Sequence, residues 1–377
     1  MAKIIQITTF FHPVHGGVEQ QVLDLSNELI KNGHKVSVYC SDSTRLKKRI
    51  QQKKDKLGKI KIRRFKTWFS FSQFYKIYPG LFFNLLKTNF DVLHVHGFRK
   101  FEVYASLIAA KLKRKRIVVT THNPFVTKSR SRILQFFVKL HDLTFGKIFS
   151  GFIDKVICLT PSEIPYLKKF NIKKDRIIVI PNGITKSAFI KGNKQAFIKN
   201  FKIPIDKYKY TVLFLGRLNS VKGLENLEIA VKQLSNTLFI FAGPDDNASA
   251  KYKKLYKSSV NVIFTGPIKH ENTINAYATA DLFLYPSKHE AFGVVLLESM
   301  AQGVPVITTN VGGPSDIVKE NFGILLDPQD QWGWMININN LLKNSRIRKQ
   351  KGINAKKEAK KYLWKNLIYR IFEAYKI

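Results

Sequence analysis

Short apolar runs alternate with stretches of helical spacing along the entire chain. Residues 18–31 carry Val22, Leu25 and Leu29 at helical spacing, and Asn32-Gly33 follows as a helix terminus. Strand-like apolar runs lie around this helix and further along, at residues 4–8, 35–40, 91–96, 116–121, 155–159 and 176–180. Strands separated by helices predict a parallel sheet with right-handed crossovers.

The same alternation restarts after a polar stretch at residues 191–209. A helix is expected over residues 224–234, and strands at 211–215, 238–242, 262–264, 282–285 and 304–308. The 377 residues exceed what one hydrophobic core usually fills. We therefore expect an α/β protein with two doubly wound, Rossmann-like domains. Ligands should bind outside the carboxyl ends of the strands, in a cleft between the domains.

The most informative segment spans residues 285–313. A buried strand is expected to end at Tyr285, a loop carries Glu290, and a helix that contains Glu298 starts near Gly293. Free N–H groups at the helix start favour an anion such as phosphate, and a carboxylate at position 298 can accept hydrogen bonds from a vicinal diol such as ribose. Alternatively, Glu290 only complements the helix dipole and Glu298 lies on a solvated face. Glu298 stands among apolar residues, where an unpaired carboxylate would be costly, which favours a functional role.

A basic pair follows an earlier strand. Arg217 comes directly after Gly216, and Lys222 directly before Gly223. At the carboxyl edge of a sheet, these two cations could converge on a diphosphate. A surface arginine and lysine prove little in a chain with 64 such residues, so the interpretation depends on the Glu290 segment as well.

Together these motifs resemble those of the retaining family 4 glycosyltransferases (glycosyltransferase group 1). Glu290 and Glu298 match the paired glutamates of that family, and Arg217 with Lys222 its diphosphate-binding pair. Other matches occur in order along nearly the whole chain: His12-Pro13, Gly16-Gly17-Val18-Glu19, Pro181-Asn182-Gly183, Gly312-Gly313 and Trp364. The chain departs from the family at Thr185 and Asp316; the first puts a linker contact in doubt and the second is conservative.

The resemblance implies a GT-B fold. It implies an N-terminal acceptor-binding domain over residues 1–190, a nucleotide-sugar-binding domain over residues 191–354, and a C-terminal helix within residues 355–377 that crosses back to the first domain. The implied donor is a nucleoside-diphosphate sugar, such as a UDP-sugar or GDP-sugar. The implied reaction retains the anomeric configuration and requires no metal ion or other cofactor.

The resemblance also implies a role for each matching residue. Arg217 and Lys222 bind the diphosphate, Glu298 holds the ribose, and Glu290 contacts and positions the donor sugar, although a nucleophilic role for Glu290 stays open. Preorganised positive charge on the leaving group is a large catalytic term for such a reaction. The implied catalytic residues are Glu290, His122, Arg217 and Lys222. The implied donor-binding residues are Gly16, Gly17, Gly216, Arg217, Lys222, Glu290, Phe292, Gly293 and Glu298.

Three histidines of the first domain are further candidates. His122 follows a strand, where the family often has a histidine that reaches the donor sugar or its phosphate; alternatively, it only caps that strand. His94 and His96 lie on one face of another strand. We interpret His94 as a satisfied core histidine and His96 as a weaker candidate for the site.

The chain carries a formal net charge of +38, with 64 basic and 26 acidic residues. Residues 1–190 hold 36 of the basic and 11 of the acidic residues, so the excess is concentrated in the acceptor half. A basic run over residues 45–66 is followed by aromatic residues, as suits an anionic membrane interface. Compositional drift or a solvated mobile loop are alternatives. The predicted acceptor and membrane residues are Arg45, Lys47, Lys48, Arg49, Arg63, Arg64, Trp68 and Phe69.

Composition limits the other classes of function. Two cysteines without metal-type spacing fit a reduced, cytosolic compartment, and neither a signal peptide nor a transmembrane helix is expected. The expected location is the inner face of the cell membrane, with a lipid-linked acceptor in surface polysaccharide or glycolipid synthesis. A soluble enzyme that makes a small glycoside or storage sugar, and a catalytically silent binding module, stay as alternatives. A nucleic-acid-binding protein is disfavoured because it leaves Glu290 and Glu298 unexplained.

Overall fold

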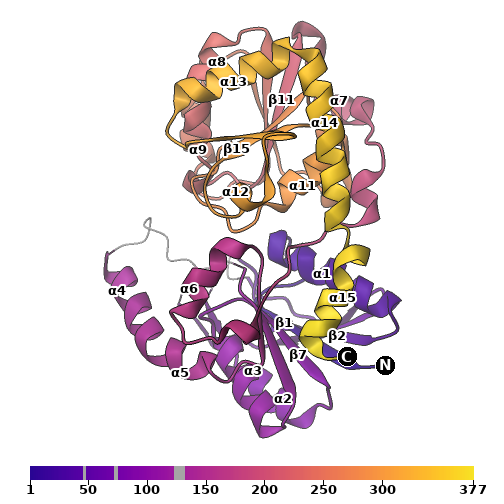
Figure 1. The fold of residues 1–377 in the computed structure, drawn as a ribbon, viewed down its shortest axis with the longest axis vertical. Helices are drawn as coiled ribbons and strands as arrows, with labels where there is room; N and C mark the ends of the chain where they lie inside the picture. The colour runs from indigo at the N-terminus through magenta and orange to yellow at the C-terminus, as the bar shows by residue number, and fades with distance from the viewer. Residues whose placement is uncertain (46–47, 72–74, 123–131) are drawn as a thin grey trace. The chain divides into compact units, whose positions relative to one another are not determined.

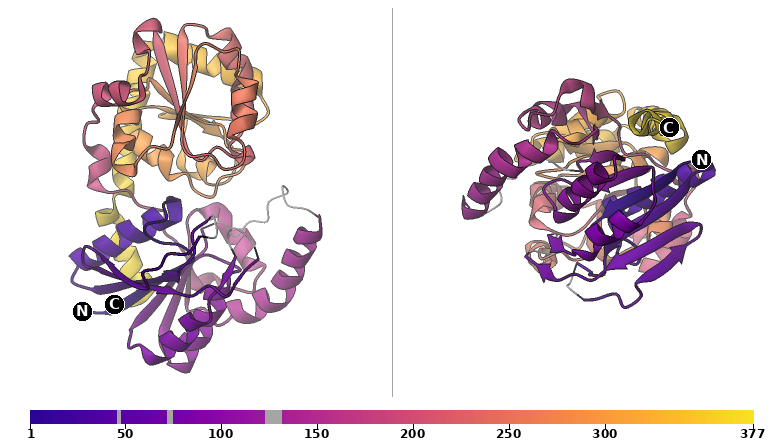
Figure 2. Two further views of the ribbon diagram at one scale, coloured as in Figure 1. Left: turned by 180° about the vertical axis from the view of Figure 1, so that it is seen from behind. Right: turned by 90° about the horizontal axis from the view of Figure 1, so that it is seen from below.

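The computed structural model describes residues 1–45, 48–71, 75–122 and 132–377, without the side chains of residues 132–134 and 137. The chain divides into two compact units (Figure 1). Unit 1 comprises Met1–Gly183 and Trp364–Ile377, and unit 2 comprises Ile184–Leu363. Each unit has a central, mainly parallel sheet with helices on both faces (Figure 2). The two doubly wound α/β units predicted from the sequence are therefore present.

Unit 1 has an eight-stranded sheet in the order β10-β9-β8-β7-β1-β2-β4-β3, in which only β3 runs antiparallel to its neighbour. The strands are β1 (Lys3–Thr8), β2 (Lys35–Ser41), β3 (Lys54–Leu57), β4 (Ile60–Phe65), β7 (Val92–His96), β8 (Arg116–Thr120), β9 (Lys155–Cys158) and β10 (Ile177–Val179); a separate pair is formed by β5 (Phe69–Ser70) and β6 (Lys76–Ile77). The helices are α1 (Gly17–Lys31), α2 (Gly80–Lys87), α3 (Phe101–Leu112), α4 (Arg132–His141), α5 (Lys147–Ser150), α6 (Ile164–Lys168) and α15 (Trp364–Tyr375).

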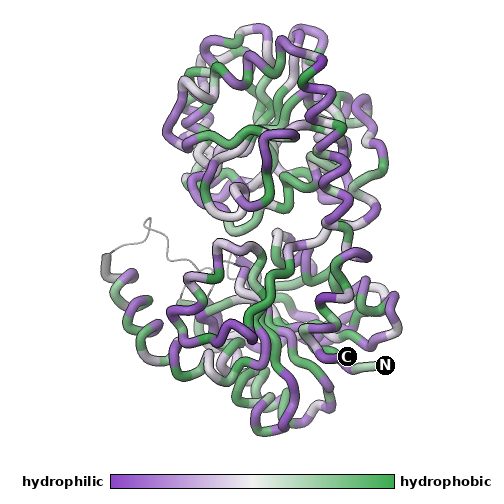
Figure 3. Tube along the Cα trace, in the orientation of Figure 1, coloured by the Kyte–Doolittle hydropathy of each residue, from purple (hydrophilic) through white to green (hydrophobic). Residues whose placement is uncertain are grey.

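The sheet of unit 1 is buried on both faces. One apolar cluster joins the strands to α2 and α3, and another joins them to α1 and α15. Strands buried on both sides have nearly continuous apolar sequences, as seen along the chain in Figure 3. Helix α15 carries Leu367 and Ile371 into the second cluster, so the last helix crosses back to unit 1 as predicted.

Unit 2 has a six-stranded parallel sheet in the order β13-β12-β11-β14-β15-β16. Its strands are β11 (Tyr210–Leu215), β12 (Thr237–Ala242), β13 (Val262–Gly266), β14 (Leu282–Tyr285), β15 (Val306–Thr309) and β16 (Gly323–Leu326). Its helices are α7 (Lys194–Phe201), α8 (Glu228–Gln233), α9 (Ser249–Leu255), α10 (Thr273–Tyr277), α11 (Val294–Ala301), α12 (Gly313–Ile317), α13 (Gln331–Lys343) and α14 (Ser345–Ala359).

The structure differs from the sequence predictions in several details, and one of them is that strand β16 (Gly323–Leu326) was not predicted. The hairpin of β3 and β4 was not predicted, because its many lysines and arginines hide the inward-facing Ile60 and Ile62. The helix predicted over residues 224–234 is a 3-10 turn (Leu224–Leu227) followed by α8. The C-terminal helical stretch is interrupted between α14 and α15, where the backbone N–H of Ile184 donates to the carbonyl of Tyr362 at 2.8 Å. No helix within the described ranges is long and apolar enough to cross a membrane.

Candidate active site

The order of strands in unit 2 fixes where a ligand can bind. Strands β11 and β14 are neighbours although they are not consecutive, so the crossovers leave in opposite directions on either side of them. Such a switch point opens a crevice outside the carboxyl ends of the strands. Strand β11 ends directly before Gly216 and Arg217, and β14 ends at Tyr285, five residues before Glu290. The predicted basic pair and Glu290 therefore follow the two strands at the switch point.

Lys222 and Glu290 form an ion pair there. Lys222 Nζ lies 2.7 Å from Glu290 Oε2, and their side chains are only 13% and 18% exposed. The Tyr285 hydroxyl donates to the same oxygen at 2.6 Å and accepts a hydrogen bond from Lys222. The other carboxylate oxygen accepts from the backbone N–H groups of Ala291 at 3.1 Å and Phe292 at 3.5 Å. Both oxygens of Glu290 are thus held in place.

These contacts determine the charge of Glu290. Burial acts to raise the pKa of its carboxyl group, but the charge of Lys222 and the hydrogen bonds from Lys222, Tyr285 and the Phe292 backbone outweigh it. The result lowers the pKa of Glu290 to about 2. The carboxylate of Glu290 is therefore ionised at neutral pH.

The loop that carries Glu290 is packed against a glycine pair. The backbone N–H of Gly313 donates to the carbonyl of Glu290 at 3.0 Å. A Cβ at Gly312, which has a φ of +59°, would overlap that carbonyl oxygen, and one at Gly313 would overlap the backbone of Ala291 and Phe292. Only glycine allows this close approach. Gly312 and Gly313 therefore hold the Glu290 loop in position.

Arg217 is held by a carboxylate that sequence reasoning missed. Its Nη1 lies 3.0 Å from Asp246 Oδ2, and Asn219 donates to the same oxygen at 2.9 Å. Asp246 follows β12, the strand beside β11. The Arg217 side chain is 38% exposed, so Asp246 orients it without enclosing it. The sequence signal that could have indicated Asp246 was its position shortly after the end of β12.

Glu298 has a different environment in α11. Its Oε2 accepts a hydrogen bond of 2.8 Å from the hydroxyl of Tyr277, which is fully buried. Burial raises the pKa of Glu298 to about 7, and the hydrogen bond from Tyr277 opposes that rise only in part. The ring of Phe283 lies between those of Tyr277 and Tyr285, with centroid distances of 5.4 and 6.1 Å. This aromatic row links the surroundings of Glu298 to those of Glu290.

The other predicted donor residues of unit 2 border the same strand ends. Helix α11 begins after Gly293, as predicted, and this glycine has a φ of +91°. The Phe292 side chain is buried, and its backbone N–H donates to the Glu290 carboxylate. Gly216 donates its backbone N–H to the carbonyl of Ala242 at 2.9 Å.

In unit 1 the corresponding switch point lies between β1 and β7. The predicted histidines lie beside it, with His94 and His96 on β7 and His122 after β8. His94 is buried and bonded through its two ring nitrogens to the hydroxyls of Tyr375 at 2.6 Å and Thr120 at 2.7 Å, as expected for a core histidine. His122 Nε2 lies 3.0 Å from His96 Nδ1, so these two candidates contact each other.

The predicted glycine loop of unit 1 precedes α1. Gly16 is the residue before the helix and Gly17 its first residue. Glu19 in the first turn binds Arg45 at 2.7 Å, and a Cβ at Gly16 would overlap both of these side chains. Arg45, predicted to face a membrane, is instead directed to the start of α1.

The structure also corrects Arg64. Its side chain is fully buried, pairs with Asp55 at 2.9 Å and donates to the carbonyl of His12 at 2.6 Å, so it cannot reach a membrane. The Arg64 guanidinium thereby connects the β3–β4 hairpin to the backbone of His12. The sequence pattern counted it among exposed cations because a basic run gives no sign of which member turns inward.

The rest of the predicted membrane set lies nearer the surface. Lys48 is exposed, Arg49 pairs with Asp42 at 2.9 Å, and Arg63 is half-buried over the Phe65 ring. Trp68 and Phe69 are 62% and 61% exposed. Lys47 lies outside the described residues.

A second exposed apolar surface of unit 1 was not predicted. It lies on α4, on the π-helical segment Asp142–Gly146, on α5 and directly after α5; these helices project from the side of unit 1 (Figures 1 and 2). We call it the α4–α5 strip; its members are between 48% and 64% exposed and are Phe136, Leu140, Leu143, Phe145, Ile148 and Phe152. The spacing of Phe136, Leu140 and Leu143 is that of one helix face and was the available signal.

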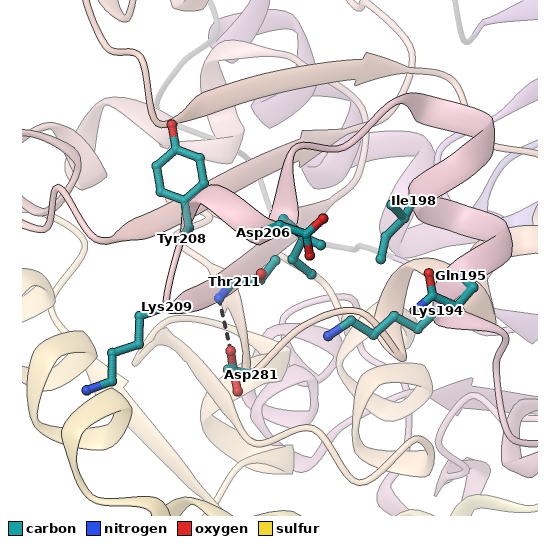
Figure 4. A pocket seen from close by; sticks show the side chains of 9 residues that line it. Lys194, Gln195, Ile198, Asp206, Tyr208, Lys209, Thr211 and Asp281 are labelled. Atoms are coloured by element: carbon teal, nitrogen blue, oxygen red, sulfur yellow. Dashed lines mark hydrogen bonds between the residues drawn. The ribbon is translucent and has the colours of Figure 1, made fainter.

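A surface pocket of about 320 Å³ lies elsewhere in unit 2 (Figure 4). It is at the amino ends of β11 and β14, whereas Glu290 and Lys222 follow the carboxyl ends. Asp281 in this pocket accepts from the backbone N–H of Thr211 at 2.9 Å and lies 3.5 Å from Arg348. Its carboxylate therefore serves the packing of the sheet, and none of the predicted site residues lines this pocket.

Two doubly wound units, one with a charged cluster at its switch point, define a protein of the GT-B class. Residues 15–187 match the family described as Glycosyltransferase Family 4, and residues 196–358 match the family described as Glycosyl transferases group 1. The chain belongs to these glycosyltransferases, as its motifs predicted.

Relatives and solved structures agree with this placement. An uncharacterized glycosyltransferase of Methanocaldococcus jannaschii is 26% identical over 100% of this chain and 98% of its own. The 2-deoxystreptamine N-acetyl-D-glucosaminyltransferase of Niallia circulans is 26% identical over 91% of this chain and 92% of its own. Sucrose-phosphate synthase of Thermosynechococcus elongatus has a TM-score of 0.78 at 20% identity, covering 100% and 98% of the two chains. Anabaena HepE in complex with UDP-glucose has a TM-score of 0.78 at 18% identity over 99% of each chain, so both structures support the GT-B fold.

Proposed function

We propose that this glycosyltransferase moves a sugar from a nucleoside-diphosphate sugar to an acceptor with retention of the anomeric configuration. The observation that carries the proposal is the Lys222–Glu290 ion pair at the switch point of unit 2. Related GT-B structures, such as those of HepE in complex with UDP and with UDP-glucose, support this class of donor.

Each group in unit 2 has a chemical task in this proposal. Lys222 and Arg217 supply positive charge to the diphosphate as its bond to the sugar breaks, which makes it a better leaving group. Glu298 accepts hydrogen bonds from the ribose diol. Glu290 positions the sugar; because both of its oxygens are already hydrogen-bonded, a positioning role fits better than a nucleophilic one. The proposal assigns no metal ion or other cofactor.

Nucleotide binding tests the diphosphate assignment. We expect Arg217→Ala to weaken the binding of the preferred nucleoside diphosphate, chosen from UDP, GDP and ADP, by about tenfold or more, because a hydrogen bond to a charged group contributes roughly 1.5–3 kcal/mol. Isothermal titration calorimetry measures the effect. Lys251→Ala is the matched control, since Lys251 is an exposed cation of unit 2 that pairs with Glu225. An unchanged Kd for Arg217→Ala would remove Arg217 from the site.

For the acceptor, we propose a lipid-linked molecule reached at the inner face of the cell membrane. The α4–α5 strip supports this, because its apolar side chains stand beside Lys139 and Lys147 on the same segment. The strongly positive net charge of residues 1–190 adds attraction to an anionic bilayer, at about 1 kcal/mol for a well-placed cation. Exposed Trp68 and Phe69 belong to the same unit and offer a second contact.

Vesicle binding tests the membrane assignment. We expect the protein to co-sediment with phosphatidylglycerol-containing vesicles. The double substitution of Phe145→Ser and Ile148→Ser should lower the partition coefficient about thirtyfold, at roughly 1 kcal/mol for each apolar side chain that leaves the interface. Both side chains are exposed, so folding should be unaffected. Val260→Ser, at an 89% exposed residue of unit 2, is the control.

Vesicle binding and two further measurements decide between the proposed function and its alternatives. No binding to anionic vesicles at physiological salt would favour a soluble enzyme that makes a small glycoside or storage sugar. Donor hydrolysis or transfer that is lost in Glu290→Ala would argue against a catalytically silent module. Salt-dependent binding to nucleic acid without any binding of nucleoside diphosphates would favour the nucleic-acid reading instead.

A further inference from the structure

A row of polar side chains crosses the switch point of unit 1. Gln6 is on β1, His96 ends the neighbouring β7, and His122 follows β8 on the far side. His96 Nε2 lies 2.7 Å from Gln6 Oε1, and His96 Nδ1 lies 3.0 Å from His122 Nε2. The three residues thus form a continuous chain of hydrogen bonds, and the direction of each bond can be worked out from one end.

The orientation of Gln6 fixes the first bond. Its amide nitrogen donates to Ser26 Oγ at 2.6 Å and reaches the carbonyl oxygen of Val22 at 3.4 Å. Ser26 Oγ gives its own proton to the same carbonyl at 2.7 Å, so it can only accept from Gln6. A flipped amide would place its oxygen against the carbonyl oxygen of Val22. Gln6 therefore presents its oxygen to His96, and His96 must carry a proton on Nε2.

The proton on His96 Nε2 then determines the state of His122. Burial lowers the pKa of His96 well below its ordinary value, helped by the neighbouring His94, His122 and Lys100, so the ring is neutral. A neutral ring with a proton on Nε2 has a lone pair on Nδ1. His122 must donate to that lone pair from its own Nε2. Burial and the charge of Lys100 lower the pKa of His122 to about 3, so its Nδ1 is left without a proton.

We propose that Gln6 and His96 are positioning residues that hold His122 in the Nε2–H tautomer, with Nδ1 as an open acceptor for a sugar hydroxyl. Among the described residues, none forms a hydrogen bond with His122 Nδ1. We call the hydrogen-bonded series Gln6–His96–His122 the relay. A lone pair at His122 Nδ1 repels a phosphate oxygen but accepts a hydrogen bond from a hydroxyl. Of the two ligands considered for His122, the relay therefore favours the sugar hydroxyl over the phosphate. The choice of a sugar hydroxyl rests on the proposed glycosyl transfer, whereas the tautomer does not.

The backbone of His122 and the groups around His96 also support a fixed position of the two rings. His122 has a φ of +51°, an uncommon conformation for a residue other than glycine, and this conformation accompanies the contact of its ring with His96. The ring of His94 lies beside that of His96, with centroids 4.1 Å apart, and is bonded to Tyr375 and Thr120. Lys100 is engaged with Thr9 at 2.8 Å.

Nuclear magnetic resonance of the full chain labelled with ¹⁵N-histidine reads the tautomer directly. Two-bond ¹H–¹⁵N correlations distinguish protonated from unprotonated ring nitrogens, and the His122→Gln spectrum assigns His122 among the nine histidines. We expect Nε2 to be protonated and Nδ1 unprotonated at neutral pH. A proton on Nδ1 of His122 in the unaltered protein would overturn the proposal.

Variants of Gln6 test its role. Gln6→Leu should let both tautomers of His122 appear and lower kcat/KM for the nucleotide sugar about five- to tenfold, the range of one neutral hydrogen bond. Gln6→Glu should favour a charged His96, which donates from both nitrogens and forces the Nδ1–H tautomer on His122. Ser150→Ala is the control, because it removes a buried hydroxyl of unit 1 that lies outside this network and donates to the carbonyl of Phe170.

The outcomes separate this inference from the proposed function. An unchanged His122 tautomer in both Gln6 variants would overturn the relay. A changed tautomer with an unchanged kcat/KM would overturn the positioning role. A protein that shows the expected tautomer but transfers no sugar from any nucleotide would contradict the proposed function and leave the tautomer assignment standing.

Discussion

Lys222→Met is expected to lower kcat/KM for the nucleotide sugar by a factor of about one hundred to one thousand. In the structure, the Lys222 ammonium is oriented by Glu290 and Tyr285. In the proposed reaction, its charge would therefore need no rearrangement as negative charge develops on the leaving diphosphate. Removal of one such preorganised group typically lowers the rate by that factor. Steady-state kinetics on the preferred donor measures the loss.

The same substitution should also destabilise unit 2. Glu290 would lose the partner that keeps its carboxylate ionised, and an unpaired charge in this largely buried place costs about 3 kcal/mol. Adding Glu290→Gln removes that charge, so the double variant should regain stability without regaining activity. Recovery of activity in the double variant would show that Lys222 acts only through folding. Lys288→Met is the matched control, because Lys288 is a 45% exposed cation in the loop that carries Glu290, and it pairs with Glu225.

Much of the fold was predictable because the strands of both units are buried on two faces. Strands of this kind give continuous apolar runs in the sequence. Each strand that was predicted from such a run begins and ends within about two residues of the predicted bounds. The β3–β4 hairpin was not predictable in this way. Only Ile60 and Ile62 turn inward there, and the cations around them suggested a solvated loop.

The candidate site was predictable as a set of residue types at strand ends, but not as a set of partners. The sequence placed Lys222 and Glu290 after two strands; that these strands are neighbours is a property of the sheet order. Tyr277, Tyr285 and Asp246, which orient the predicted residues, come from three different elements. Spacing along the chain contains no information about such contacts between distant segments.

The buried Arg64 illustrates the same limit for charge. A net excess of cations describes a surface on average, and it favoured a membrane face across residues 45–66. Arg64 and Arg45 nevertheless pair with Asp55 and Glu19, so both are used inside unit 1. Whether a cation is available to a ligand depends on the few acids within reach of it, and tertiary structure decides which acids those are.

Glu298→Gln is expected to make the protein more stable above pH 7 while it weakens nucleotide binding. The ordinary pKa of a glutamate is 4.5, and burial raises that of Glu298 to about 7. Between these two values the folded chain holds a proton that the unfolded chain has released, so the stability contributed by Glu298 falls as the pH rises through this window. Because the Glu298 side chain is partly exposed, we reduce the effect for solvent screening. The raised pKa then lowers the free energy of unfolding by about 2 kcal/mol above pH 7. Glutamine does not titrate and can still accept from Tyr277.

Thermal unfolding across pH 4.5 to 8 tests whether the stability contributed by Glu298 falls as the pH rises. The melting temperature of Glu298→Gln should equal that of the unaltered protein at the acid end and exceed it by several degrees at pH 8. Glu228→Gln, at a carboxylate that pairs with Lys232 on the surface of α8, is the control and should show no such trend. A lower melting temperature for Glu298→Gln at pH 8 would contradict the buried, proton-holding carboxyl group.

Nucleotide affinity should follow the opposite course from stability. The ionised carboxylate is the better acceptor for two ribose hydroxyls, so binding releases the proton and the affinity for a nucleoside diphosphate should rise from pH 6 to pH 8. Glu298→Gln should remove this pH dependence and weaken binding at pH 8 about ten- to a hundredfold. Equal affinity of the two proteins at pH 8 would exclude Glu298 from the ribose contact, whatever its pKa. In the proposed ribose contact, the Glu298 carboxylate would gain hydrogen bonds that it does not form without the nucleotide. This gain would offset the stability that the buried carboxylate takes from the fold at the pH where the nucleotide binds.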